Sequence, residues 1–137
     1  MASLTPMTRR LSTTFVLVAL AVSVLGACGS GGGGASAKCP AKVDTMTATA
    51  GAISVCASDI KFDVVTIMAK PGLLKITLVN DGAIYHTLKI NKTDLELKAN
   101  GGKTDAGTVT LSKGTYDFDC TVSGHAAAGM KGKIEVG

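Results

Sequence analysis

The chain of 137 residues has no tryptophan, only 4% aromatic residues and only two histidines, His86 and His125. Its two arginines, Arg9 and Arg10, both lie near the start, and the formal net charge of +4 is not concentrated in any one segment. Without a basic cluster, the sequence offers no electrostatic footprint for nucleic acid, so we exclude nucleic acid as a partner. No internal repeat with a period of about 20–50 residues is present, which argues against a solenoid.

The first 27 residues have the layout of an export signal. Arg9 and Arg10 precede an apolar run, Leu11–Leu25, and small residues follow it. Positive charge, a short apolar stretch and small residues are typical of a secretory signal peptide, and the run is shorter than the roughly 20 residues that span a bilayer. We therefore predict a signal peptide over residues 1–27. A permanent amino-terminal membrane anchor is the alternative.

The end of the apolar run carries a second signal. The segment Leu25-Gly26-Ala27-Cys28 resembles the lipobox of bacterial lipoproteins. The resemblance implies that Cys28 is lipidated and that the protein is held on the extracytoplasmic side of a bacterial cell membrane, because such lipoproteins carry the several acyl chains that stable anchoring requires. Residues 28–38 are rich in glycine and serine and are predicted to be a flexible linker, with a root-mean-square reach of roughly 15–18 Å for about nine residues.

Residues 39–137 have the pattern of a single all-β domain. Short apolar or alternating segments are separated by turn residues such as Pro71-Gly72 and Asp81-Gly82. This spacing, without a long helical period, predicts a Greek-key β-sandwich. The predicted strands lie at residues 64–69, 74–80, 86–90, 108–111, 116–120 and 131–136. Residues 92–98 fit either a strand or a short helical turn.

The four cysteines, Cys28, Cys39, Cys56 and Cys120, bear on where the protein functions. Disulfides persist outside the cytoplasm, so pairing is expected in an exported domain. If Cys28 carries lipid, Cys39 and Cys56 can close a small loop that contributes about 3 kcal/mol of stability. Cys120 then remains a free thiol. A disulfide from Cys120 to Cys39 or Cys56 is the structural alternative.

The surroundings of Cys120 suggest a metal site. His125 follows Cys120 by five residues, Met130 follows His125 by five, and His86 lies upstream. Two histidines, a cysteine and a weak methionine form the ligand set of a blue-copper electron-transfer site. Zinc is the alternative metal, but methionine is a poor zinc ligand.

On these residues the sequence resembles the cupredoxin family of plastocyanin- and azurin-like blue copper proteins. The resemblance extends from about Asp59 to the end of the chain, and the Cys-x4-His-x4-Met spacing is most similar to auracyanin- and rusticyanin-type members. It implies one type 1 copper ion, with His86, Cys120 and His125 as near-planar ligands and Met130 as the long axial ligand.

The resemblance has two departures. The residue after the first histidine is often asparagine in this family, where it links the two ligand loops by hydrogen bonds, and here it is Thr87. Its hydroxyl is expected to make part of that link. Ser123 stands where azurin-like loops have proline, while Thr121 and Gly124 match those loops. Neither departure removes a ligand, but both are expected to affect the reduction potential.

The predicted function is that of a membrane-tethered, extracytoplasmic electron carrier. We expect the protein to be a monomer. We do not expect an enzyme, because the two histidines leave none to build a second copper site. Redox protein partners are expected to dock near His125, where Ala126–Gly129 provide small side chains. The alternative function is copper handling or delivery, for which exposed methionine- or histidine-rich sites are more usual.

Overall fold

The computed structural model describes residues 39–137, and the predicted signal peptide, linker and lipidation site at Cys28 lie outside these residues. None of the described residues forms a helix that could cross a membrane. They form ten strands: β1 (Val43–Thr47), β2 (Ala52–Ser58), β3 (Lys61–Phe62), β4 (Val64–Ala69), β5 (Gly72–Asn80), β6 (His86–Ile90), β7 (Glu96–Ala99), β8 (Thr104–Leu111), β9 (Gly114–Asp119) and β10 (Lys131–Val136).

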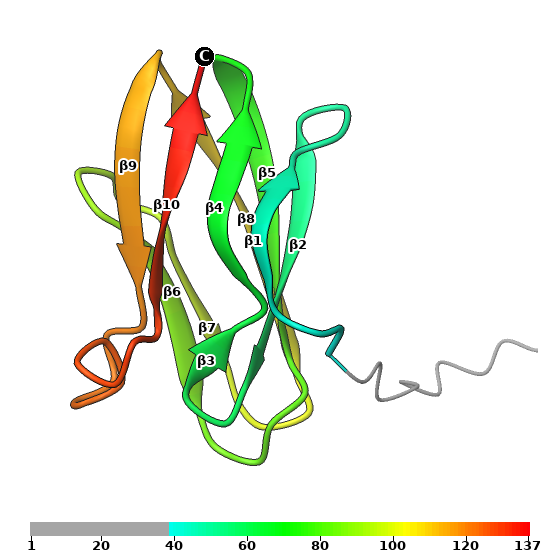
Figure 1. The fold of residues 1–137 in the computed structure, drawn as a ribbon, viewed down its shortest axis with the longest axis vertical. Coiled ribbons are helices and arrows are strands. Elements are labelled where there is room, and N and C mark those ends of the chain that lie inside the picture. Colours follow the sequence, from blue (N-terminus) through cyan, green and yellow to red (C-terminus); the bar gives the residue numbers. More distant parts are fainter. Residues whose placement is uncertain (1–38) are drawn as a thin grey trace, which may run out of the picture. The chain divides into compact units, whose positions relative to one another are not determined.

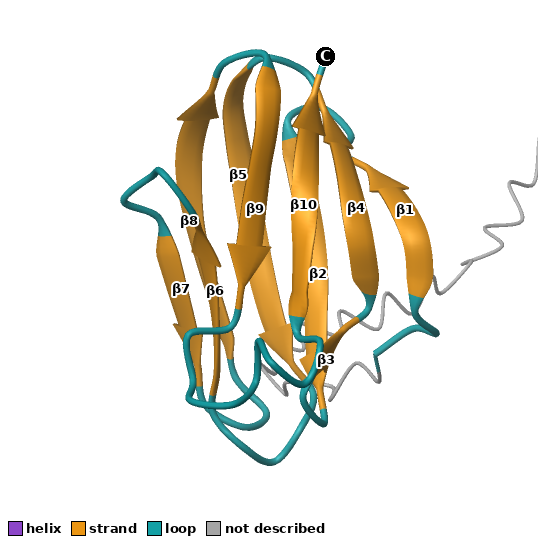
Figure 2. Cartoon of the chain, turned by 60° about the vertical axis from the view of Figure 1, so that its left-hand side comes forward, coloured by secondary structure: helices purple, strands orange, loops and turns teal. Residues whose placement is uncertain are grey.

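The strands form two sheets that pack face to face (Figure 2). One sheet has the order β1-β4-β10-β9-β6-β7 and the other β3-β2-β5-β8. Both sheets are mixed, because β4 pairs in parallel with β1 and β10, and β2 pairs in parallel with β5. The chain changes sheet repeatedly, for example from β4 to β5 and from β7 to β8. The predicted all-β sandwich is therefore confirmed.

The core lies between the sheets, where alternate residues of each strand meet. In β5, Leu74, Ile76 and Leu78 are buried while the residues between them are more exposed, as period-2 alternation requires. The rings of Phe62 and Phe118 come from opposite sheets, with centroids 5.5 Å apart and a tilt of 57°. Aromatic pairs at this separation add to the apolar burial that holds the two sheets together.

The disulfide predicted between Cys39 and Cys56 is present, and it closes a loop with a sequence separation of 17. The backbone N–H of Cys39 also donates to Asp81 Oδ2 at 2.9 Å. Asp81 follows β5 directly, so the first described residue is held beside the loop that leads into β6. This loop, the β2–β3 turn and the loop between β9 and β10 lie at the same end of the sandwich, opposite the carboxyl terminus (Figure 1).

Candidate metal centre

Two segments that are far apart in the sequence meet at this end. His86 is the first residue of β6, and Cys120 follows the last residue of β9 directly. Cys120 and Met130 frame the loop that returns the chain to β10, and the backbone N–H of Cys120 donates to the carbonyl of Met130 at 3.1 Å. The loop is therefore anchored at the points where two adjacent strands end and begin.

The backbone of this loop turns back on itself around His125. The N–H of His125 donates to the carbonyl of Val122 at 3.0 Å, and the carbonyl of His125 accepts from the N–H of Met130 at 3.0 Å. Gly124 has a φ of 83°, a conformation that a residue with a side chain rarely adopts. These contacts hold the backbone of His125 in place within the loop.

Three of the four predicted ligands form a tight cluster. Ligand atoms of His86, Cys120 and His125 all lie within 4.8 Å of one another. The Cys120 sulfur is 3.5 Å from Nδ1 of His125, and the two imidazole centroids are 5.1 Å apart. All three residues are buried, and Met130 is fully buried at the end of the same loop. A single small ion fits among such donors.

The hydrogen bonding of His86 supports a metal at this position. Both ring nitrogens of His86 are buried, and neither has a hydrogen-bond partner. A buried polar atom without a partner costs about 1–3 kcal/mol, so such atoms are rare unless a ligand satisfies them. Burial and the neighbouring His125 lower the pKa of His86, which favours the neutral imidazole that binds a metal.

The donor set itself selects the metal. Cys120 is the free cysteine among the described residues, and a soft thiolate and thioether combined with imidazoles suit copper in either oxidation state. The predicted residues therefore fit copper. The alternative of a disulfide at Cys120 is wrong, because Cys39 and Cys56 pair with each other.

The link expected from Thr87 is also present. The hydroxyl of Thr87 accepts from the backbone N–H of Thr121 at 2.7 Å, and the backbone N–H of Thr87 donates to the Cys120 sulfur at 3.4 Å. The two loops that carry the ligands are thus joined through one threonine. Glu96 also contacts this link, because its carboxylate accepts a hydrogen bond from the Thr121 hydroxyl at 2.9 Å. The sequence pattern did not predict this contact, since it left the structure of residues 92–98 open.

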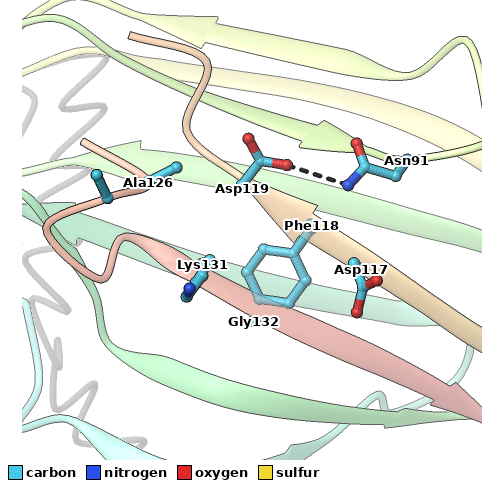
Figure 3. Close-up of a pocket in the computed structure, with 8 residues that line it drawn as sticks. Asn91, Asp117, Phe118, Asp119, Ala126, Lys131 and Gly132 are labelled. Atoms are coloured by element: carbon cyan, nitrogen blue, oxygen red, sulfur yellow. Dashed lines mark hydrogen bonds between the residues drawn. The ribbon is translucent and has the colours of Figure 1, made fainter. Parts of the chain in front are cut away.

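A surface cavity of about 600 Å³ lies beside the loop (Figure 3). Ala126 and Ala127 line it from the loop, and Asp117, Asp119 and Lys131 line it from β9 and β10. Asn91, which also lines the cavity, donates to Asp119 at 3.2 Å along one side of it (Figure 3). The small residues after His125 therefore border a depression with charged groups of both signs.

The comparisons agree with the geometry of the site. A family model described as "Copper binding proteins, plastocyanin/azurin family" matches residues 44–137. No curated protein matches the chain in sequence.

Several solved structures share the fold. A reduced auracyanin from the photosynthetic bacterium Roseiflexus castenholzii matches with a TM-score of 0.58 at 20% identity, covering 66% of this chain and 98% of its own. Auracyanin A, described as a "blue" copper protein from Chloroflexus aurantiacus, matches with a TM-score of 0.55 at 22% identity, covering 68% and 99%. Rusticyanin from Thiobacillus ferrooxidans matches with a TM-score of 0.55 at 23% identity, covering 72% and 85%.

Proposed function

Because this chain belongs to the plastocyanin/azurin family of copper-binding proteins, we propose that it carries single electrons between redox partners outside the cytoplasm, tethered to the cell membrane by lipid on Cys28. The observation that carries the proposal is the buried cluster of His86, Cys120 and His125, with Met130 at the end of the same loop. Copper bound there supplies a one-electron Cu(I)/Cu(II) couple.

The protein's own residues favour a carrier because they hold the ligands rigidly. The backbone bonds of the loop fix His125, and Thr87 joins the His86 strand to the Cys120 loop. A fold that keeps the same ligand positions before and after electron transfer lowers the rearrangement that each transfer needs. Burial of the ligands argues against the alternative of copper delivery, since a cargo metal must be reached by a recipient's ligands.

The docking surface that we propose surrounds His125. His125 retains 8% exposure, and Ala127, Ala128 and Gly129 after it are exposed. Ile84 and Tyr85, directly before His86, are 46% and 41% exposed, which extends the apolar surface on the other ligand loop. A redox partner seated here approaches the metal closely because the intervening side chains are small.

The tethered location is proposed from the sequence of residues 1–38 alone. Cys39 is held against Asp81, at the same end as the ligand loops. A chain anchored at Cys28 therefore has its linker attached near the metal centre, which suits partners embedded in the same membrane. We propose that the protein acts there as a monomer.

Optical and electron-paramagnetic spectra of the full-length chain loaded with Cu(II) test the proposal. We expect an intense blue charge-transfer band that a reductant bleaches reversibly, and Cys120→Ser, the matched control, should abolish it. A pale spectrum typical of nitrogen and oxygen ligands alone would contradict the electron-carrier proposal and favour copper delivery. Fractionation of cells that express wild type or Cys28→Ala tests the anchor, and equal membrane retention of the two would contradict lipidation.

A further inference from the structure

Glu96 lies at the outer end of a chain of hydrogen bonds that begins at the metal-binding sulfur. The Thr87 hydroxyl lies 3.7 Å from the Cys120 sulfur and 2.9 Å from the Thr121 hydroxyl. The Thr121 hydroxyl lies 2.9 Å from Oε1 of Glu96. Two threonine side chains thus connect the buried Cys120 sulfur to a carboxylate at the surface.

The number of hydrogens in this chain is limited. Each threonine hydroxyl has one hydrogen to donate, and an ionised carboxylate only accepts. The Thr121 hydroxyl therefore donates to Glu96 and turns its lone pairs toward Thr87. The Thr87 hydroxyl then has a good acceptor in Thr121 at 2.9 Å, much nearer than the sulfur at 3.7 Å.

Without the Glu96 carboxylate, the direction of the hydrogen bond between the two threonine hydroxyls reverses. The Thr121 hydroxyl is then free to donate to Thr87, whose own hydrogen has the Cys120 sulfur as its remaining acceptor. The sulfur would accept two hydrogen bonds, one from this hydroxyl and one from the Thr87 backbone N–H at 3.4 Å. Hydrogen bonds to the cysteine sulfur withdraw electron density from the metal and tune its potential.

We propose that Glu96 is a positioning residue for the copper centre, which directs the Thr87 hydroxyl away from the Cys120 sulfur and so keeps the reduction potential low. Glu96 acts through Thr121 and Thr87 and does not touch the metal site itself. The hydrogen bond from Thr121, and then Lys98 at 3.1 Å from the other carboxylate oxygen, lower the pKa of Glu96 and so favour its ionised form. The inference rests on the proposed copper centre.

Redox titration of the copper-loaded full-length chain tests the inference. Glu96→Ala should shift the electron-exchange equilibrium with a fixed reference couple about tenfold toward the reduced form, which is about 59 mV for a one-electron couple. Transfer from H2O to D2O should also shift the copper–sulfur vibration in resonance Raman spectra more in Glu96→Ala than in wild type. The reason is that an additional exchangeable hydrogen bonds to the sulfur in the variant.

A matched control separates this effect from the loss of charge alone. Glu135 pairs with Lys133 at 2.6 Å on β10, just as Glu96 pairs with Lys98 on β7, but the structure gives it no link to the sulfur. Glu135→Ala should therefore leave the potential and the D2O shift nearly unchanged. Glu96→Gln keeps an acceptor oxygen for Thr121 and should restore most of the wild-type potential.

A double-mutant cycle with Thr121→Val completes the test. The Thr121 variant removes the relay hydroxyl, so it should raise the potential by itself, and adding Glu96→Ala should then have little further effect. Additive shifts, or equal shifts for Glu96→Ala and Glu135→Ala, would overturn the inference. If Glu96→Ala keeps an intense blue band and its potential is unchanged, only the inference about Glu96 is overturned. If wild type lacks the band, the proposed copper centre is overturned as well.

Discussion

The hydroxyl of Thr87 accepts a hydrogen bond from the backbone N–H of Thr121 at 2.7 Å, across 34 residues of sequence. One of the two residues follows His86 directly and the other follows Cys120 directly. This contact therefore joins two ligand-bearing segments. The buried hydroxyl of Thr87 makes part of the link that the family resemblance leads one to expect from an asparagine.

Thr87→Val should weaken the fold as well as the site. The change removes the acceptor for the Thr121 N–H, and a lost hydrogen bond of this kind costs about 1 kcal/mol. Denaturant unfolding of the metal-free chain measures this change in the free energy of unfolding. Thr87→Ser keeps the hydroxyl and is the control; equal stability of the serine and valine variants would show that the bond does not stabilise the fold.

Removal of the disulfide should destabilise the domain without abolishing copper binding. Cys39→Ser opens the loop that the disulfide closes between two cysteines with a sequence separation of 17. On the chain-entropy model this lowers the free energy of unfolding by about 3 kcal/mol. The ligand cluster does not include Cys39 or Cys56, so the blue band should keep its position. Thermal unfolding and an absorption spectrum check the two expectations. An unchanged unfolding temperature would contradict the first.

The turn between β2 and β3 is strained at Ile60. Asp59 and Ile60 have φ values of 47° and 67°, and a β-branched residue is disfavoured in this region by about 1–2 kcal/mol. Ile60→Gly creates the Asp-Gly pair that such two-residue hairpin turns prefer, and Ile60 is 38% exposed, so little burial is lost. We expect the free energy of unfolding to rise by about 1 kcal/mol. Glycine at exposed Leu73 is the control and should not stabilise.

The buried carboxyl of Asp63 should make stability depend on pH. Burial raises its pKa, although the Cys56 N–H, which donates to Oδ1 at 2.9 Å, partly offsets this. The folded state therefore binds the Asp63 proton more tightly than the unfolded state does. The stability that this proton contributes is fully present below the pKa of the unfolded state, about 3.9, and is lost as the pH rises through the pKa of the folded state.

Asp63→Asn removes this loss while keeping an oxygen that can accept from Cys56. The difference in the free energy of unfolding between variant and wild type should grow in favour of the variant as the pH is raised from about 4 into the neutral range. Unfolding of the metal-free proteins at several pH values measures this difference. A difference that stays constant across that range would rule out Asp63 as the cause.

Ala127→Glu tests the docking surface without a known partner. Electron self-exchange between reduced and oxidised copies brings two such surfaces together, and a carboxylate on each copy adds like-charge repulsion. We expect the rate constant to fall about tenfold at low salt and to recover partly at high salt, while the blue band stays unchanged. Leu73→Glu places the same charge in β5, away from the ligand loops. If both variants slow exchange equally, the surface around His125 is not the contact.

The fold was predictable because alternation marks the strands that face the core. β4, β6 and β10 have the predicted bounds. β1 escaped prediction because it is an edge strand whose residues are mostly exposed, so it has no apolar alternation. β2 was missed although Ile53, Val55 and Ala57 alternate inward, and β3 is only two residues long.

The site was predictable where its residues are close in sequence or rare in the chain. Residues 92–98 stayed ambiguous because they contain both structures: a turn in which the Thr93 hydroxyl donates to the Ile90 carbonyl, and then β7 from Glu96. The contact of Glu96 with Thr121 spans 25 residues and depends on how β6, β7 and β9 are arranged. Sequence spacing does not encode that arrangement.

The two ends of the described chain lie at opposite ends of the sandwich (Figure 1). Cys39 is held beside the ligand loops, and Gly137 lies at the far end. If Cys28 is lipidated, as we propose, the described domain joins its tether at the end that carries the ligand loops, and its carboxyl terminus lies at the opposite end. The search for a partner then takes place largely in two dimensions.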